Sequence, residues 1–227
     1  MNKITLTLAA IASLSVSSFA FDGRINIGGT PGAAGTTPGG GGPFTVTVTQ
    51  SNTVGMTQLG SPFLAFCLEL NENINLNNNQ GYYVNISNQA INGGGGPNPD
   101  PISLVTAYMY SQYRAGNIAT TAAGAAALQN AIWWMEQEIS SPILAAATLI
   151  SNAKTALGLN ALTDAQLRAL NANGAYGVRA LNVYSNPSLT SLNQDMLAMV
   201  PEPSTYAAAA LLMLPVLIQA RRMRRSA

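Results

Sequence analysis

The chain has 227 residues, of which 48% are hydrophobic and only 8% are charged, and its formal net charge is +1. This length and apolar content suffice for one domain with a buried core, and the polar but uncharged remainder suits exported surface and matrix proteins. The chain has no histidine and a single cysteine, which excludes histidine-dependent nucleophilic catalysis and sites built from several thiolates.

Residues 1–20 have the pattern of a secretory signal peptide. Lys3 precedes an apolar run over residues 4–16, and Ser18 and Ala20 supply the small side chains of a cleavage site. We therefore predict cleavage after Ala20 and export of the remaining chain across the inner membrane.

Strand-like segments follow a Gly/Pro-rich stretch at residues 28–43, which predicts a flexible loop. Apolar and hydroxylated side chains alternate over residues 44–49, and this period of two predicts a half-buried strand. Further strands are predicted at residues 54–59, 63–70 and 81–87. Between them, the asparagine-rich residues 71–80 predict a loop.

Helical patterns occupy the middle of the chain. Asp100 and Pro101 are typical of an N-cap and a first helical position, so they predict a helix that ends at Gly116. Apolar residues at helical spacing predict two more helices, at residues 120–139 and 142–157.

A capping box of Thr163 and Gln166 predicts a short helix that closes at Gly174. Two strand-like or extended segments follow, at residues 176–184 and 189–200. The order of strands, helices and strands predicts one α+β domain over residues 21–200, a small antiparallel β-sheet or barrel with an inserted helical subdomain.

Cys67 has no disulfide partner within the chain, so its presence in an exported protein needs another explanation. Gln129 lies in the predicted helix at residues 120–139, one turn before Trp133. Its side-chain amide is an acyl group that a thiolate can attack with loss of ammonia, leaving an internal thioester. The alternative is that Cys67 is a small buried hydrophobic residue and that Gln129 belongs to an ordinary amphipathic helix.

The run FCLE at residues 66–69, combined with LQNAIWWME at residues 128–136, resembles the Cys–Gln thioester domains of bacterial surface proteins. The resemblance implies that Cys67 and Gln129 are the bonded pair, with Ala131, Ile132 and Trp133 matching the rest of the helix motif. The family often has Thr where this chain has Leu128.

The same resemblance implies single-use covalent attachment of the protein to an amine or a polysaccharide hydroxyl on a partner, without catalytic turnover. The protein is therefore expected not to be an enzyme. Trp133, Trp134 and Glu136 could shield the bond or orient the nucleophile. Core packing for the tryptophans and surface solvation for Glu136 are equally open interpretations.

The C-terminal residues 201–227 contain Pro201-Glu202-Pro203, an apolar run at residues 206–220 and a cluster of four arginines. This order resembles the PEP-CTERM sorting signal of Gram-negative bacteria. The resemblance implies a short transmembrane helix, recognition by an exosortase, removal of the tail near the Pro-Glu-Pro motif, and delivery to the cell surface or the extracellular biofilm matrix. A permanent tail anchor is the alternative.

Residues 21–200 carry five basic and eight acidic side chains, a net charge of −3, so nucleic-acid binding is not expected. No cofactor or metal is expected either. Two other functions remain open. One is a non-reactive structural protein of the exopolysaccharide matrix, and the other is a calcium-dependent surface module that uses Asn71, Asn73 and Asn75.

Overall fold

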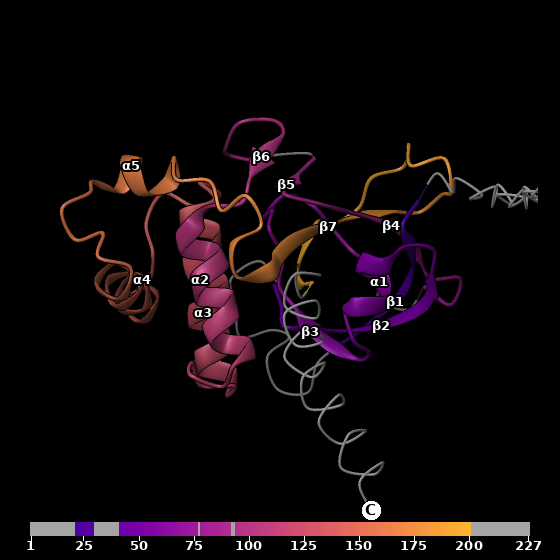
Figure 1. Cartoon of the computed structure of the whole chain (residues 1–227), viewed down its shortest axis with the longest axis horizontal. Coiled ribbons are helices and arrows are strands. Elements are labelled where there is room, and N and C mark those ends of the chain that lie inside the picture. The colour runs from indigo at the N-terminus through magenta and orange to yellow at the C-terminus, as the bar shows by residue number, and fades with distance from the viewer. Residues whose placement is uncertain (1–20, 30–40, 77, 92–93, 201–227) are drawn as a thin grey trace, which may run out of the picture.

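The computed structural model describes residues 21–29, 41–76, 78–91 and 94–200 (Figure 1). The predicted signal peptide with Ala20 lies outside these residues, as does the predicted sorting signal with Pro201, Glu202 and Pro203.

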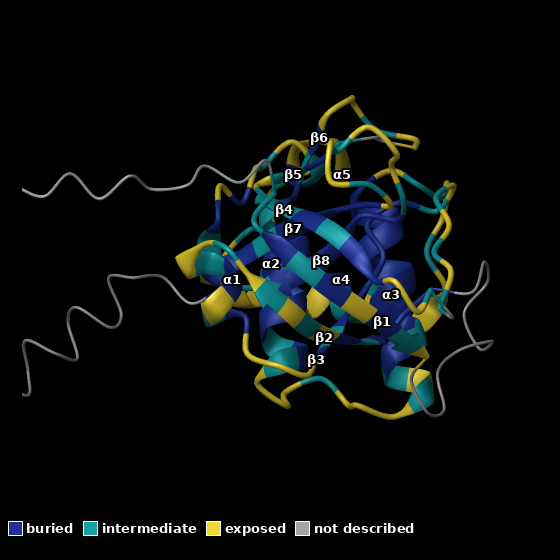
Figure 2. Ribbon diagram, turned by 90° about the vertical axis from the view of Figure 1, so that its right-hand side faces the viewer, coloured by how far each residue is buried: buried dark blue, intermediate teal, exposed yellow. Residues whose placement is uncertain are grey.

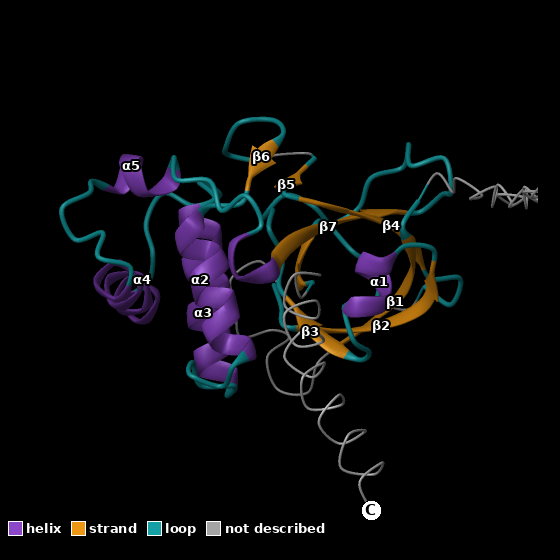
Figure 3. Ribbon diagram, viewed as in Figure 1, coloured by secondary structure: helices purple, strands orange, loops and turns teal. Residues whose placement is uncertain are grey.

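A six-stranded antiparallel sheet curls into a nearly closed barrel (Figure 3). Its strands, in spatial order, are β3 (Phe63–Ala65), β2 (Phe44–Ser51), β1 (Gly23–Gly29), β4 (Tyr82–Ser87), β7 (Val178–Tyr184) and β8 (Met196–Met199). The segment after β3 closes the barrel against the start of β8. Leu197 donates its backbone N–H to the Phe66 carbonyl, and Leu68 donates to the Asp195 carbonyl, both at 2.9 Å.

The helices α2 (Leu104–Arg114), α3 (Ala122–Met135), α4 (Leu144–Ala156) and α5 (Asp164–Arg168) are inserted between β4 and β7 and lie to one side of the barrel (Figure 1). A small hairpin of β5 (Gln89–Ala90) and β6 (Asp100–Pro101) precedes them, and a 3-10 turn at Ala175–Gly177 leads into β7. The predicted α+β fold, a small antiparallel barrel with a helical insertion, is confirmed.

The strand β7 separates two hydrophobic cores and is buried on both faces (Figure 2). One face contributes Leu181 and Val183 to the barrel core, which also contains Ile25, Val46, Phe63, Val84 and Met196. The other face contributes Val178 and Ala180 to the helical core, with Val105, Tyr110, Leu128, Ile132 and Leu167. This explains why β7 lacks the alternation that marks β2, whose outer face is only partly covered.

The helix α3 lies at the boundary between the two cores. Trp133 packs into the barrel core, whereas its neighbour Trp134 packs into the helical core. Gln129 precedes Trp133 by one helical turn and therefore shares its barrel-facing side. Gln129 and Trp133 therefore face the place where the barrel closes, between the segment after β3 and the start of β8.

Several local predictions were wrong. Residues 54–59 were predicted as a strand, but Val54–Gln58 form the short helix α1 because the Thr53 side chain caps it by accepting the Met56 N–H. Asp100 and Pro101 do not begin a helix but pair with β5 as strand β6, and Ser103 caps α2 instead, accepting from the Thr106 N–H.

Other boundaries also shifted. The capping box at Thr163 and Gln166 is present, but α5 ends at Arg168 rather than at Gly174. Regular pairing in the predicted strand at residues 63–70 is limited to β3, after which the chain turns to the β8 edge. The strand β1 was not predicted, and its last two residues, Gly28 and Gly29, fall within the stretch predicted as loop.

Candidate functional site

The Gln129 side chain is fully buried and all of its amide atoms are hydrogen-bonded. Its Oε1 accepts the backbone N–H groups of Gly42 and Cys67, each at 3.0 Å. Its Nε2 donates to the Cys67 carbonyl at 2.9 Å. The Gln129 side chain therefore contacts the backbone of Cys67, and the orientation of the amide is determined by backbone groups.

Cys67 lies in the segment that closes the barrel, directly opposite Met196 of β8. It is a free cysteine with only 4% of its surface exposed. Burial raises the pKa of its thiol to about 12, the Gly42 N–H opposes this rise, and the negative charge of Glu72 adds to it. The sulfur is therefore protonated at neutral pH and protected from bulk oxidants and alkylating agents.

Gly41 and Gly42 bring the backbone of the preceding loop onto Gln129. A Cβ atom at Gly41 would lie 2.6 Å from Gln129 Cγ and 2.8 Å from Trp133 Cη2, and one at Gly42 would lie 2.7 Å from the Ala65 carbonyl oxygen. Only glycine fits at such separations. Sequence reasoning did not predict this role, although a Gly-Gly-Pro run directly before a strand was the available signal. Residues 41–43 are buried, so this end of the predicted flexible loop is part of the site.

Two N–H groups directed at one carbonyl oxygen form the arrangement that stabilises an oxyanion. When a nucleophile adds to the amide carbon, negative charge develops on Oε1, where the Gly42 and Cys67 N–H groups already point. Preorganised donors of this kind lower the barrier to acyl transfer because they need no reorientation as charge develops.

The remaining motif residues have packing roles. Ala131 and Ile132 are fully buried in the helical core, and Trp133 is 2% exposed within the barrel core. The Trp133 Nε1 has no hydrogen-bond partner among the described residues. The Arg168 guanidinium lies over the Trp134 ring, with its Cζ atom 4.1 Å from the ring centroid.

Glu136 is buried and not solvated at the surface. It accepts the Ser103 N–H at 3.3 Å and the Thr106 hydroxyl, so it ties the end of α3 to the start of α2. Burial raises its pKa to about 7, against the effect of these hydrogen bonds.

A small cavity of about 110 Å³ reaches Cys67 from the surface. Its polar lining consists of Glu72, Asn73 and Gln194. Its apolar lining consists of Phe44, Leu70, Ile74, Leu76 and Trp133. This cavity is a path by which a slim molecule can approach the sulfur.

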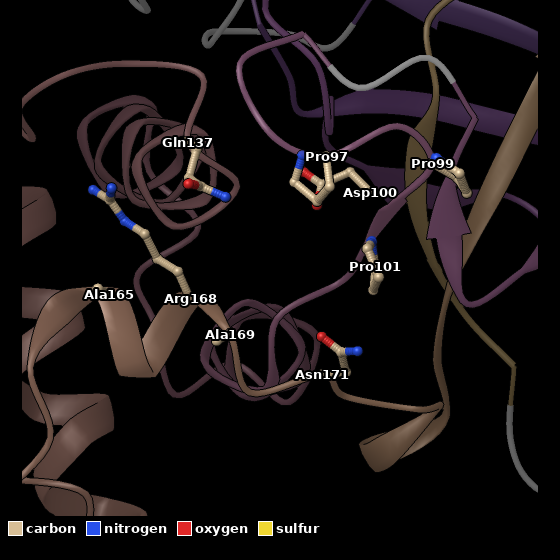
Figure 4. A pocket seen from close by; sticks show the side chains of 9 residues that line it. All are labelled: Pro97, Pro99, Asp100, Pro101, Gln137, Ala165, Arg168, Ala169 and Asn171. Atoms are coloured by element: carbon tan, nitrogen blue, oxygen red, sulfur yellow. The ribbon is translucent and has the colours of Figure 1, made fainter.

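A larger cavity of about 520 Å³ lies between the loop before β6 and the helix α5 (Figure 4). Its wall combines proline rings with Asp100, Gln137, Arg168 and Asn171, and Figure 4 shows the Gln137 and Asn171 amides on opposite sides of the opening. Asp100 is 5% exposed, and its Oδ2 has no hydrogen-bond partner among the described residues. Burial and the negative charge of Glu138 raise its pKa to about 7.

Behind this cavity lies an acidic junction formed by Glu69, Asp100, Glu136 and Glu138, which influence one another electrostatically. Glu69 accepts the Gly94 N–H and Glu138 accepts the Gly95 N–H, both at 2.6 Å. Burial, together with the charge of Glu138, raises the pKa of Glu69. Within the described ranges no group of three or more acidic or cysteine side chains is arranged to hold a metal ion.

Comparison of the chain with protein-family models, curated proteins and solved structures finds no match in any of the three. In the part of the chain that the structure describes, no helix is both long and apolar enough to cross a membrane. The predicted membrane segment at residues 206–220 lies outside that part.

Proposed function

We propose that the protein is an exported surface or extracellular-matrix protein whose Cys67 and Gln129 form an internal thioester for single-use covalent attachment to a partner. One observation carries the proposal. The Gln129 carbonyl oxygen accepts two backbone N–H groups, one of them from Cys67 itself, in a fully buried site. Two donors on one carbonyl oxygen stabilise the negative charge that develops there when a nucleophile adds to the carbon.

Atoms and protons balance when the thioester forms, and no external base is needed. The Cys67 sulfur adds to the Gln129 amide carbon, and the two N–H groups stabilise the resulting oxyanion. The C–N bond then breaks, and the thiol proton leaves with the amide nitrogen as ammonia. Because burial raises the pKa of Cys67 to about 12, the thiol keeps its proton until this transfer.

In the attachment step the Cys67 sulfur is the leaving group, whereas it was the nucleophile when the thioester formed. A nucleophile on the partner, a primary amine or a sugar hydroxyl, attacks the Gln129 acyl carbon, and the C–S bond breaks to release Cys67. The product is a stable amide or ester. Each molecule reacts once, so the protein acts as a covalent adhesive rather than as an enzyme.

The intact mass of the purified protein tests the proposal. We expect a mass short by one ammonia, a full mass in the Cys67→Ala variant, and a methylamine adduct only in the wild-type protein. A full wild-type mass, with Cys67 alkylated only after denaturation, would contradict the thioester.

The sorting proposal rests on the Pro201-Glu202-Pro203 motif, the apolar run and the terminal arginines. We propose that an exosortase removes this segment and releases the protein to the cell surface or matrix. Replacement of Glu202 by Ala should leave the protein membrane-associated, with the C-terminal arginines still detectable by mass spectrometry. Release of this variant at the wild-type level would argue against exosortase processing.

A second candidate, a non-reactive protein of the polysaccharide matrix, is favoured by the larger cavity. Its volume is within the range of about 300–1,000 Å³ that ligand pockets occupy. Asp100, Gln137 and Asn171 offer acceptors and donors suited to hydroxyl groups. Neutral oligosaccharides should then shift amide NMR signals of these residues, and a Gln137→Ala/Asn171→Ala variant should lose the shifts while Asn160→Ala keeps them.

A further inference from the structure

The helix α3 ends beside the larger cavity, and Gln137, the residue after its C-cap, contributes its side chain to the cavity wall. Gln137 has a φ of +69°, a left-handed conformation that glycine adopts easily and other residues adopt at a steric cost. The Gln137 N–H bonds to the Trp134 carbonyl at 3.3 Å, and the Glu138 N–H bonds to the Trp133 carbonyl at 2.7 Å. These two bonds form a Schellman motif, in which glycine is the usual residue at this position.

Two other helices of this chain end with the same motif, and both have glycine at the left-handed position. Gly116 follows α2 with a φ of +80°, and Gly158 follows α4 with a φ of +69°. In both cases the glycine N–H and the next N–H bond back to the last turn of the helix, as they do at Gln137. Backbone strain that a glycine would relieve is found preferentially at functional sites. The Gln137 side chain therefore needs a reason other than the termination of α3.

The Gln137 amide lies across the cavity from the Asn171 amide (Figure 4). Within the part of the chain that the structure describes, neither side-chain amide has a hydrogen-bond partner. Each amide can donate through its NH₂ group and accept through its oxygen. A ligand between them therefore meets a donor and an acceptor on both sides.

The rest of the lining combines apolar rings with one basic and one acidic side chain. Three proline rings lie on the side away from Arg168 (Figure 4), namely Pro97, Pro99 and Pro101. Arg168 has its guanidinium over the Trp134 ring and forms no ion pair among the described residues, so its donors remain for a ligand. A ligand carboxylate would face Asp100 and the acidic junction behind it, which disfavours an anion. The lining thus suits an uncharged ligand with a donor, an acceptor and an apolar end.

We propose that this cavity binds a sugar ring that carries an acetamido group, as N-acetylated amino sugars do. The acetamido N–H donates to one of the two side-chain amides, its carbonyl accepts from the other amide or from Arg168, and its methyl group packs on the proline rings. A hydroxyl lacks the apolar end, and an ammonium group lacks the acceptor. The proposal rests on the sugar binding of the second candidate function, whose ligand class it specifies, and does not depend on the thioester.

The first test titrates the full-length exported protein with three disaccharides in a calorimeter. Diacetylchitobiose carries acetamido groups where cellobiose has hydroxyls and where fully deacetylated chitobiose has ammonium groups. We expect diacetylchitobiose to bind roughly 10-fold more tightly than either of the others. Equal binding of cellobiose, or tighter binding of the deacetylated sugar, would overturn the acetamido assignment and leave sugar binding by the cavity in place. Binding of none of the three would overturn the proposal together with the second candidate function, whereas the thioester is tested separately by the intact mass.

The second test uses Gln137→Gly, which separates loss of a ligand contact from loss of the fold. Glycine relieves the backbone strain, so this variant should melt at or above the wild-type temperature and yet bind diacetylchitobiose roughly 10-fold more weakly. Asn160→Ala removes an amide outside the cavity and should bind as the wild type does. Wild-type affinity in Gln137→Gly would overturn the role of Gln137 in binding. A clearly lower melting temperature would also overturn it, because the glutamine would then be explained by stability.

Discussion

Gln129 joins three distant parts of the chain through one side chain. Its hydrogen bonds reach Gly42 and Cys67, which are 87 and 62 residues away in the sequence. A buried amide is tolerated only when its polar atoms are paired, and here the pairing groups are the same backbone atoms that would stabilise the acyl-transfer intermediate. The hydrogen bonds that stabilise the fold at this position therefore also serve the proposed chemistry.

Replacement of Gln129 by Leu should lower the free energy of unfolding by about 2–4 kcal/mol, because two buried N–H groups and one carbonyl lose their partner. The measurement is urea unfolding in a Cys67→Ala background, where no thioester can contribute. Equal stability of the Leu and Gln forms would show that these hydrogen bonds contribute little.

Gly41→Ala should destabilise the protein by about 1–3 kcal/mol and reduce thioester formation, because its Cβ would press on Gln129 and Trp133. Gly28→Ala is the matched control, since the nearest atom to its Cβ would be the Thr45 carbonyl oxygen at 3.8 Å. Thermal unfolding and intact mass together measure both effects. If both variants behave like the wild type, the close packing of Gly41 on Gln129 is not required.

Among the secondary-structure elements, the acidic junction links the β5–β6 hairpin to α3. Glu138 accepts N–H groups from Leu70 and Gly95, so one side chain holds the chain beyond β3 and the hairpin loop to the end of the helix. Among the described residues, no lysine or arginine pairs with any of these four carboxyl groups. Their mutual repulsion is limited because burial favours the neutral forms of Glu69, Asp100 and Glu136, whose pKa values it raises.

Stability should fall as pH rises through about 6 to 7. Burial raises the folded-state pKa of Asp100 and Glu136 to about 7 and that of Asp195 to about 6, above their unfolded values. The folded protein therefore binds more protons than the unfolded chain in this interval, and the resulting stabilisation is present at acid pH and lost on titration. Melting temperatures at about pH 5 and 8 measure the effect.

Asp100→Asn should flatten this pH dependence, whereas Asp164→Asn on the surface should not. A melting temperature that rises from acid to neutral pH would contradict the assigned direction of the shifts.

At the scale of the whole molecule, the barrel closes through Asp195 as well as through backbone pairing. Its carboxylate is fully buried and accepts from Ile91, Asn182 and Val183, while its backbone bonds to Leu68 and Glu72. It thus connects β7, the start of β8, the hairpin and the segment that contains Cys67. The position of the Cys67 thiol and its shielding from solvent depend on this closure of the barrel.

Asp195→Ala should cost about 3 kcal/mol or more, because several buried N–H groups lose their acceptor. Once methylamine has opened the thioester, the variant should also expose Cys67 to alkylation under native conditions. Urea unfolding and the rate of iodoacetamide labelling measure the two effects, with Asp164→Ala as the surface control. Slow labelling that matches the wild type would mean that the barrel stays closed without Asp195.

Local features were predictable from the sequence because their causes are local. Alternating apolar residues specified β2, the capping box of Thr163 and Gln166 specified the start of α5, and the order of strands and helices specified the α+β class. The choice of Cys67 and Gln129 also came from sequence, through residue chemistry and a family resemblance.

Only the tertiary structure decided which distant groups meet. Neither the Gly42 N–H on Gln129 nor the presence of Glu72 in the lining of the cavity beside Cys67 could be inferred, because both depend on how the barrel closes. Tertiary context likewise turned Asp100 and Pro101 into a strand and gave the glycine-containing β1 its place between β2 and β4. Periodicity and capping act over a few residues, whereas these contacts join segments that only the packing of two cores around β7 brings together.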